Sequence, residues 1–424
     1  MKKSTFLLIL FLSIVVKSLL AFSTFHPDIM AFNLAGRLVR EGNIFNLYDY
    51  IGNLSVDHPL RKVYPPDVFI YPPVVYLFFG FVSTTLTKIV PGNVVENMIY
   101  NLNSVLGTSQ FNSFLFLFKI SYLPFDLGIS FLLFRLFKKY RYKLLAFIFW
   151  TFNPVAIYVT YMQGQFDIIP TFFVVLSLYV LTQKQSLSIR NIYLASFCLG
   201  LGASLKVYPL LFILPVALLA SKWRDKIGVF AVGLGTYLLT LLPFLDSVSF
   251  RSSALVAGHT LKSFYAQIPV SGGQSIILYL ASIIFVYLVF YYHKVEADSI
   301  WQRFFVILLI FFIFTHYHPQ WFLWLTPFLI IDLVKSDLEH WPLVFISLFS
   351  FIVLLFFFDP SLTIGLFLPV YPALVNSPSL WSILGLHPDI NFLRSVFHTL
   401  FVSVAIYYFY FLMFYEKEVK IGGD

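Results

Sequence analysis

The chain has 424 residues, of which 59% are hydrophobic and 11% are charged, and its mean hydropathy is strongly positive. This composition excludes an ordinary soluble protein, because several apolar runs reach the roughly 20 residues that a membrane-spanning helix needs. The net charge of +8 does not indicate a nucleic-acid-binding protein, since the basic residues lie in short clusters between apolar runs, as topology signals do. The sequence therefore predicts an all-α polytopic membrane protein with a single domain over residues 1–424.

The first apolar run, residues 4–22, is predicted to be an uncleaved first span, because it is long and no small-residue cleavage pattern follows it cleanly. Further runs bring the predicted total to about twelve spans. They lie at residues 113–135, 144–161, 168–183, 192–204, 207–221, 227–245, 273–293, 302–315, 317–334, 341–358 and 394–415. The single cysteine, Cys198, lies inside one of these runs, so an intramolecular disulfide and a thiolate metal site are both excluded.

The run at residues 70–89 is predicted to be re-entrant or interfacial. A full crossing there would place the cluster Lys138–Lys143 outside while Lys2 and Lys3 lie inside, against the positive-inside bias. Without that crossing, the basic residues fall on the cytoplasmic side, namely Lys138–Lys143, Lys184, Arg190, Lys222–Lys226, Lys294, Arg303, Lys335, Lys417 and Lys420. The other side then receives a long first external loop, residues 23–112, with juxtamembrane helices.

Polar and titratable side chains are concentrated in the external segments. They are His26, Asp28, Asp57, His58, Asp67, Gln165, Asp167, Lys206, Tyr208, His259, His316, His318, Gln320 and Trp321. Ionisable groups at membrane depth are costly, so Asp167 and Lys206, a few residues from apolar stretches, are predicted to line a polar cavity that opens outward.

Several of these residues also have purely structural interpretations, which the sequence leaves open. Asp28 suits the N-terminus of a helix running to Arg40 as well as a catalytic role. Asp167 suits a cap of the following helix, and Lys206 suits a lysine that extends to the interface. Asp126, which lies mid-span, is predicted to pair with Lys119 as a structural contact.

Six segments follow the first span in a characteristic order. They are "FHPDIMAFNLAGRLVREGNIFNLYDY", "YPPVVYLFFG", "FKISYLPFDLGISFLLFRLFKKYRYK", "NPVAIYVTYMQGQFDIIPTFFVVLSLYVL", "GLGASLKVYPLLFILP" and "HYHPQWFLWLTP". Their order and spacing, from about Phe6 to Val334, resemble the GT-C superfamily of integral-membrane glycosyltransferases. Within it the chain is most similar to the dolichyl-phosphate-glucose-dependent glucosyltransferases and to prokaryotic polyprenyl-phosphate-sugar mannosyltransferase-like proteins.

The resemblance implies a GT-C-like bundle with a catalytic aspartate in the first external loop, a place that Asp28 occupies. Family members often carry two adjacent acidic residues or His-Asp there, whereas this chain has His26-Pro27-Asp28. The resemblance also implies that the remaining candidates contact substrate, with the histidine pair near the phosphate of the donor. These substrate-binding candidates are His26, Gln165, Asp167, Lys206, Tyr208, His316, His318 and Gln320.

The expected chemistry is single-displacement transfer of a hexose from a polyprenyl-phosphate donor to a hydroxyl of a glycolipid or lipid-linked oligosaccharide. Asp28 would act as the base, and Lys206 with His316 or His318 would stabilise the departing phosphate, with Arg61 and Lys62 as further candidates. Such a step inverts the anomeric centre. We expect no cofactor, no metal ion and no nucleic-acid partner, and an active site on the non-cytoplasmic face of the cell membrane or the endoplasmic reticulum.

Two other classes of protein remain open from the sequence. A transporter or flippase of lipid-linked saccharides would also place polar groups at membrane depth, but such proteins tend to show paired repeats, and no repeat is visible here. A structural membrane subunit without activity would leave Asp28, Asp167 and Lys206 without a common purpose. Whether these three side chains come together in the fold discriminates between the hypotheses.

Overall fold

The computed structural model describes residues 3–183, 187–255, 261–293, 296–316 and 318–415. It is 74% helical, and the strands described form one short antiparallel hairpin, β1 (Gln267–Pro269) with β2 (Ser275–Ile277). This confirms the prediction of an all-α fold. The predicted positions His259, Lys184, Lys294, Lys417 and Lys420 lie outside the described residues.

Six helical segments of the described chain are long and apolar enough to cross a membrane. They cover Phe6–Ser23, Ser109–Leu136, Tyr140–Met162, Trp223–Phe244, Ala297–Phe314 and Ile390–Phe414. Shorter apolar helices of 10–17 residues cover Pro73–Leu86, Ile168–Thr182, Ile189–Ala203, Tyr208–Leu218, Leu278–Tyr292 and Trp341–Leu355. The helices thus indicate a multi-pass membrane protein, but the predicted count of about twelve spans is not confirmed.

The elements follow the chain in this order. The N-terminal part holds α1 (Lys3–Ser23), α2 (Asp28–Arg40), α3 (Leu47–Tyr50), α4 (Pro59–Val63), α5 (Pro73–Leu86), α6 (Gly92–Tyr100), η1 (Leu102–Ser104), α7 (Ser109–Ile120), α8 (Leu123–Leu136), α9 (Tyr140–Thr151), α10 (Pro154–Ile157) and the π-helix η2 (Tyr158–Met162). The middle holds α11 (Ile168–Thr182), α12 (Ile189–Ala203), η3 (Tyr208–Phe212), α13 (Ile213–Leu218), α14 (Trp223–Leu241), η4 (Leu242–Phe244), η5 (Phe250–Leu255), η6 (Lys262–Phe264), β1 and β2. The C-terminal part holds α16 (Leu278–Tyr292), η7 (Ala297–Ser299), α17 (Ile300–Phe314), η8 (Pro319–Trp324), α18 (Thr326–Lys335), α19 (Trp341–Leu355), η9 (Pro360–Leu362), η10 (Ile364–Phe367), η11 (Pro372–Asn376), α20 (Leu380–Ile383), α21 (Ile390–Tyr410) and η12 (Phe411–Tyr415).

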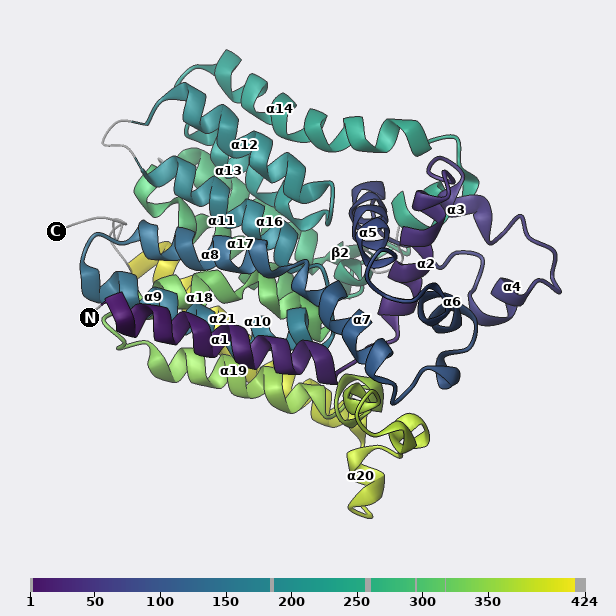
Figure 1. Cartoon of the computed structure of the whole chain (residues 1–424). Helices are drawn as coiled ribbons and strands as arrows, with labels where there is room; N and C mark the ends of the chain where they lie inside the picture. Colours follow the sequence, from purple (N-terminus) through teal and green to yellow (C-terminus); the bar gives the residue numbers. More distant parts are fainter. Residues whose placement is uncertain (1–2, 184–186, 256–260, 294–295, 317, 416–424) are drawn as a thin grey trace.

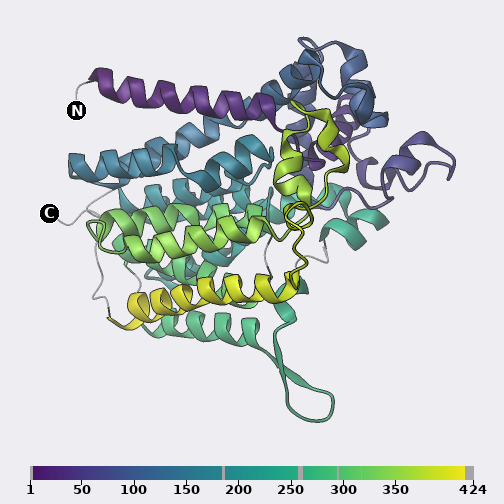
Figure 2. The same ribbon diagram turned by 90° about the horizontal axis from the view of Figure 1, so that it is seen from below.

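The long helices lie side by side in one bundle, and α2 to α6 form a separate cap at one end of it (Figure 1). Helix α1 begins, and α21 ends, at the opposite end of the bundle (Figure 2). In the same view the β1–β2 hairpin extends away from the bundle at the end that carries the cap, and the segment around α20 extends away from that end in Figure 1. The chain between the first span and α7 therefore folds as a helical layer over one end of the bundle.

The outer helices carry large apolar side chains on their exposed faces. Phe11 on α1 is 61% exposed, Leu239 on α14 is 68% exposed and Phe285 on α16 is 50% exposed. Extended apolar surfaces of this kind are rare on soluble monomers, and a lipid environment would solvate them. The helix exteriors thus agree with the membrane assignment made from hydropathy.

A buried hydrogen-bond network joins α1 to the neighbouring helices. Lys17 Nζ lies 2.6 Å from Asp126 Oδ2, and both side chains are almost fully buried. Tyr161 OH donates to the same carboxylate oxygen at 2.7 Å, and Trp150 Nε1 donates to Oδ1 at 2.8 Å. The predicted partner of Asp126 was Lys119, and this prediction is wrong, because Lys17 occupies that position from the adjacent helix.

Lys119 instead fixes two segments at the end of the bundle that carries the cap. Its Nζ donates to the carbonyl oxygens of Thr24 at 2.5 Å and Met162 at 3.1 Å, and to that of Ala21 at 3.3 Å. These bonds satisfy carbonyl groups at the end of α1 and at the end of η2 that helix termini leave open. The loops that follow α1 and η2 are thereby held against each other.

The cap is anchored by close packing between α2 and α5. A Cβ on Gly36 would lie 2.5 Å from the carbonyl oxygen of Phe79, and a Cβ on Gly80 would lie 2.3 Å from Val39 Cγ1. Only glycine permits that approach at both positions. Helix α5 falls in the run at residues 70–89 and packs on α2 in the cap (Figure 1). Whether this run is re-entrant stays a prediction.

Candidate active site

Asp28 is the first residue of α2, as the helix predicted over residues 28–40 requires. Its Oδ2 accepts a 2.6 Å hydrogen bond from Gln165 Nε2, and its side chain is 42% exposed. The N-cap position is Pro27, and among the described residues no backbone N–H of α2 donates to the Asp28 carboxylate, so the capping interpretation is not supported by the contacts. A carboxylate at a helix N-terminus is stabilised in its charged form by the helix dipole.

His26 supports the turn that presents Asp28. Its Nδ1 accepts the backbone N–H of Asp28 at 3.3 Å and also lies 3.6 Å from Asp28 Oδ2. Burial lowers the pKa of His26 below its ordinary value, and the nearby carboxylate of Asp28 opposes this effect. Because Nδ1 already accepts a hydrogen bond, the ring is neutral and we interpret the contact as positioning, not as an ion pair.

Gln165 reaches Asp28 from a tight loop after η2. Gly164 has a φ of +73°, and a Cβ there would lie 2.8 Å from Ile29 Cδ1, so the conformation and the space both require glycine. The carbonyl oxygen of Gly164 accepts a 2.9 Å hydrogen bond from Tyr122 OH. This loop therefore places the Gln165 amide beside Asp28.

Asp167 and Lys206 form a buried ion pair next to this carboxylate. Lys206 Nζ lies 2.6 Å from Asp167 Oδ1, and Trp324 Nε1 donates to the same oxygen at 2.6 Å. Burial lowers the pKa of Lys206, and Asp167, and to a smaller degree Asp28, opposes this effect. Lys206 is 9% exposed, so it does not extend to the interface as a lone lysine near a span end often does.

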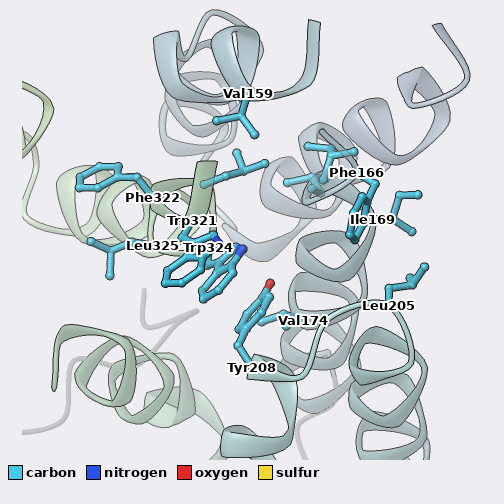
Figure 3. Packing of buried hydrophobic residues seen from close by; sticks show 14 of the residues in the cluster. Val159, Phe166, Ile169, Val174, Leu205, Tyr208, Trp321, Phe322, Trp324 and Leu325 are labelled. Atoms are coloured by element: carbon cyan, nitrogen blue, oxygen red, sulfur yellow. The ribbon is translucent and has the colours of Figure 1, made fainter. Parts of the chain in front are cut away.

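Aromatic rings surround this ion pair. The Tyr208 ring stacks on Trp324 with centroids 4.2 Å apart, and Trp321 lies on the same stack 5.4 Å from Trp324. Figure 3 shows the three rings together, with Phe166 across from them. Lys206 Nζ lies 5.3 Å from the ring centroids of both Trp324 and Phe166, a distance at which cation–π attraction contributes.

Tyr71 and Gln320 complete the same cluster. The phenol of Tyr71 hydrogen-bonds with the Gln320 side chain, and burial together with Asp28 and Asp167 raises its pKa. Its ring contacts Phe166 at 4.8 Å between centroids. Tyr71 therefore stays protonated as a hydrogen-bond donor.

Several buried acceptor atoms in the cluster lack partners within the described residues. They are Gln165 Oε1, Asp167 Oδ2, Gln320 Oε1 and His318 Nδ1. A buried polar atom without a hydrogen bond costs roughly 1–3 kcal/mol. Four such atoms in one cluster indicate a place where a hydroxyl-bearing ligand or water supplies the missing donors.

The two predicted histidines lie at one edge of the cluster. Burial lowers the pKa of His318 to about 3, with smaller contributions from the neighbouring His26 and Lys206. Burial also lowers the pKa of His316, which stacks on Phe358 at 6.0 Å between centroids. At neutral pH both rings are therefore uncharged, which disagrees with the expectation that one of them supplies a positive charge.

The structure gathers most of the predicted residues and leaves a few apart. Asp28, Gln165, Asp167, Lys206 and Gln320 come together, as the enzyme hypothesis expected of Asp28, Asp167 and Lys206. Tyr208 contributes its ring, while its hydroxyl pairs with Thr171 at 3.2 Å. His316 is displaced towards α21. Arg61, on α4, bonds to the carbonyl of Ile51 at 3.5 Å and is absent from these contacts.

Sequence reasoning missed Tyr71 and Trp324. Tyr71 opens the "YPPVVYLFFG" segment, in which nothing in the sequence distinguishes this tyrosine from the other aromatic residues. Trp324 lies four residues after Gln320, inside a run that suits an aromatic membrane belt. A tryptophan of an aromatic belt lies at the membrane interface, whereas the indole N–H of Trp324 donates to the buried carboxylate of Asp167. Only the fold reveals this contact. The described residues contain no group of three or more His, Cys, Asp or Glu side chains that would hold a metal ion.

The comparison with protein families decides the class of protein. The profile of glycosyltransferase family 87 matches residues 69–319, which is more than half of the chain. The chain belongs to glycosyltransferase family 87. It is thus a multi-pass membrane glycosyltransferase of the GT-C type, and the GT-C resemblance seen in the sequence is confirmed. A comparison of this family 87 chain with curated proteins found no match.

The family assignment gives the gathered residues a common context. The matched stretch contains Tyr71, Gln165, Asp167 and Lys206, whereas Asp28 precedes it and Gln320 and Trp324 follow it. The polar cluster of this family 87 protein is therefore assembled from the matched stretch and from the segments on both sides.

Proposed function

We propose that the protein is an inverting glycosyltransferase that moves a hexose from a polyprenyl-phosphate donor to an acceptor hydroxyl, with Asp28 as the base. The observation that carries the proposal is the contrast between the two carboxylates of the site. Asp28 is 42% exposed and its Oδ1 has no partner within the described residues. Asp167 is fully buried and already holds Lys206 and Trp324. A base needs a free lone pair that the acceptor hydroxyl can reach. Asp28 offers one on an exposed side chain, whereas the free Oδ2 of Asp167 is fully buried.

The proposed step is a single displacement. The acceptor hydroxyl gives its proton to Asp28 as its oxygen forms a bond to the anomeric carbon of the donor sugar. The bond from that carbon to the phosphate oxygen breaks at the same time, and the phosphate leaves with the electron pair. Attack from the face opposite the leaving group inverts the anomeric centre, and no enzyme nucleophile takes part.

The neighbouring residues have separate proposed roles in this step. Gln165 donates to Asp28 Oδ2 and leaves Oδ1 directed to the acceptor. The unpartnered acceptor atoms of Gln165, Asp167 and Gln320 suit the hydroxyl groups of a hexose, and Tyr71 adds a donor. Lys206 places a positive charge near Asp28 while paired with Asp167. His26 and His318 shape the site as neutral rings.

The proposed membrane face and donor follow from the position of the polar cluster in the bundle. The cluster lies at the capped end of the bundle, whereas the basic connections around Lys138–Lys143 and Lys222–Lys226 join helices at the other end (Figure 1). By the positive-inside rule the capped end is the non-cytoplasmic one. Nucleotide-activated sugars are made in the cytoplasm, so a lipid-linked sugar is the donor that suits this face. We treat residues 1–424 as one domain, because segments on both sides of the matched stretch supply the site.

The test is transfer of radiolabelled hexose by the purified full chain, with a short-chain polyprenyl-phosphate hexose and a nucleotide hexose as alternative donors. The proposal expects product only from the lipid-linked donor, with the anomeric configuration inverted when the product is analysed by NMR. Asp28→Asn protein serves as the blank. Retained configuration would contradict the single displacement, and transfer from the nucleotide sugar alone would contradict the donor class. Saccharide transport without transfer would favour the transporter hypothesis.

A further inference from the structure

A cavity of about 210 Å³ opens at the external end of the bundle, beside the cluster around Asp28. It is lined by His316, Leu354, Phe358, Arg394, Ser395 and His398. His316 follows α17, Leu354 lies in the last turn of α19, and Phe358 follows the end of that helix. Arg394, Ser395 and His398 lie in the first three turns of α21. Three of the six lining residues are basic and none is acidic. Arg394 and His398 lie outside the family-matched stretch, and sequence reasoning did not single them out.

Arg394 supplies the permanent charge of this cavity. One of its terminal nitrogens, Nη2, donates to the carbonyl of Phe357, and its guanidinium lies 4.5 Å from the centroid of the Phe358 ring. Its Nε is buried and has no hydrogen-bond partner within the described residues, where Arg394 also makes no ion pair with a carboxylate. An arginine stays protonated in proteins and presents a planar set of donors that fits phosphate oxygens. A half-buried arginine with a vacant, buried Nε donor therefore points to an anionic ligand.

Two histidines, His316 and His398, also line the cavity near the positive charge of Arg394. His398 Nε2 lies 2.8 Å from the carbonyl oxygen of Phe312, which orients the ring at the end of α17. Burial lowers the pKa of His316, and the positive charges of Lys262 and then Arg394 lower it further. These repulsions show that positive charge accumulates around His316. A bound anion would offset this repulsion, which adds to the effect of burial on the ring.

The cavity lies next to the proposed reaction centre. The Phe358 ring contacts His316 at 6.0 Å and His318 at 5.8 Å between centroids, and so lies between the two histidines. His318 in turn is close enough to Asp28 and Lys206 for their charges to affect it. In a single displacement the leaving phosphate departs on the side of the sugar opposite the base. The cavity occupies a position beyond His318 in which such a phosphate would be bound.

We propose that this cavity binds the phosphate of the lipid-linked donor, with Arg394 as its charged ligand. The inference rests on the proposed function, because it assigns the phosphate of the proposed donor to this cavity. It adds a residue that stabilises the charge developing on the leaving phosphate, a role that the neutral histidines and the paired Lys206 do not fill at neutral pH. An anionic phospholipid also carries a lipid-linked phosphate, so it is the alternative ligand that the cavity could bind by the same chemistry.

The experiment is binding of a short-chain polyprenyl phosphate to the purified full chain in nanodiscs of a zwitterionic lipid, followed by native mass spectrometry. The matched polyprenol, inorganic phosphate and an anionic phospholipid are used as competitors. We expect the polyprenyl phosphate to bind at least tenfold more tightly than the polyprenol or inorganic phosphate alone. Competition by the anionic phospholipid at equal concentration would overturn the assignment to the donor.

Two variants test the cavity itself. Arg394→Gln is expected to weaken binding of the polyprenyl phosphate about tenfold to a hundredfold, since a charge-assisted hydrogen bond is lost, and to leave polyprenol binding unchanged. Ser395→Leu narrows the cavity from an exposed position and keeps the contacts of Arg394, so it separates loss of the site from loss of the fold. The control is Arg251→Gln, an exposed arginine that donates to the carbonyl of Leu245 at 2.5 Å and does not line the cavity.

The possible failures are distinguishable. If Arg394→Gln and Ser395→Leu both bind polyprenyl phosphate as wild type does, the inference is overturned, even where Asp28→Asn still abolishes transfer. If wild type transfers no sugar while both variants lose binding, the phosphate site stands and the proposed function is wrong. Loss of binding in the Arg251→Gln control as well would show a general charge effect and would also overturn the assignment.

Discussion

Two buried lysine–aspartate pairs in this protein have nearly the same chemistry and different surroundings. Lys17–Asp126 joins membrane helices, and Lys206–Asp167 lies beside Asp28, each with an N–O distance of 2.6 Å. A tryptophan indole donates to the carboxylate in both pairs, Trp150 to Asp126 and Trp324 to Asp167. The difference lies in the remaining oxygen of each carboxylate.

In the Lys17–Asp126 pair every carboxylate oxygen has a partner, because Tyr161 shares Oδ2 with Lys17 while Trp150 holds Oδ1. In the other pair Lys206 and Trp324 share Oδ1, and Oδ2 of Asp167 has no partner within the described residues. A complete network stabilises the fold by itself, whereas an incomplete one leaves an acceptor for a ligand or a water molecule. The comparison therefore predicts a structural role for the first pair and a functional role for the second.

The largest effect on stability is expected for Asp126→Leu, which leaves the charge of Lys17 buried in the bundle without its carboxylate partner. Removing one partner of a buried ion pair costs about 3–5 kcal/mol of unfolding free energy. Lys17→Met/Asp126→Leu removes both charges and is expected to recover most of that stability. Thermal unfolding in detergent measures both variants. A double variant that is no more stable than the single one would contradict the structural role.

The next effect separates the two pairs. Lys206→Met/Asp167→Leu is expected to retain folding in the same way but to lower sugar transfer about a hundredfold, because substrate contacts and the charge near Asp28 disappear. Lys17→Met/Asp126→Leu is the matched control and should transfer sugar at a rate close to that of wild type. Equal activity of the two double variants would break the comparison.

A smaller effect is expected on the pH dependence of the stability of the folded protein. His318 has a pKa of about 3 in the folded protein and an ordinary value of 6.5 when unfolded. Between these values the unfolded chain binds a proton that the folded chain does not, so stability is lost as the pH falls below 6.5. At pH 5 the loss is about 2 kcal/mol.

His318→Gln is expected to flatten this dependence in thermal unfolding measured from pH 7 to pH 5. His387→Gln, which changes an exposed histidine, is the control and should leave the profile unaltered. A profile of His318→Gln as steep as that of wild type would show that other groups cause the acid sensitivity.

The smallest effect is expected for Gln165→Leu, which removes the donor that orients Asp28. Loss of a hydrogen bond to a charged group should lower kcat about tenfold with little change in the KM of the donor. Gln110→Leu, at the exposed start of α7, serves as the control. A change in KM alone would instead make Gln165 a binding residue.

The sequence predicted those features that depend on local information. Helix α2 begins at Asp28 and ends at Arg40 as expected, because the start and end signals lie within the segment itself. The polar positions near Gln165 and Lys206 were found because charged and amide side chains are costly beside apolar spans.

Contacts between residues far apart in the chain could not be predicted from the sequence. Lys119 was chosen for Asp126 because it lies two turns away along the chain, whereas Lys17 is 109 residues away and only the packing of α1 against its neighbours brings it there. The bond from Trp324 to Asp167 spans 157 residues. The charge state of His318 likewise depends on burial, which a "HYHP" segment does not reveal.

The most direct test of the account is the rate of sugar transfer by Asp28→Asn with saturating donor, with donor binding measured on the same preparation. Asp57→Asn, which changes an exposed carboxylate in the same segment between α1 and α7, is the control. The account predicts that Asp28→Asn binds donor as wild type does and transfers sugar at least a hundredfold more slowly, because the base is missing. A variant that transfers sugar at the wild-type rate would contradict the central role of Asp28.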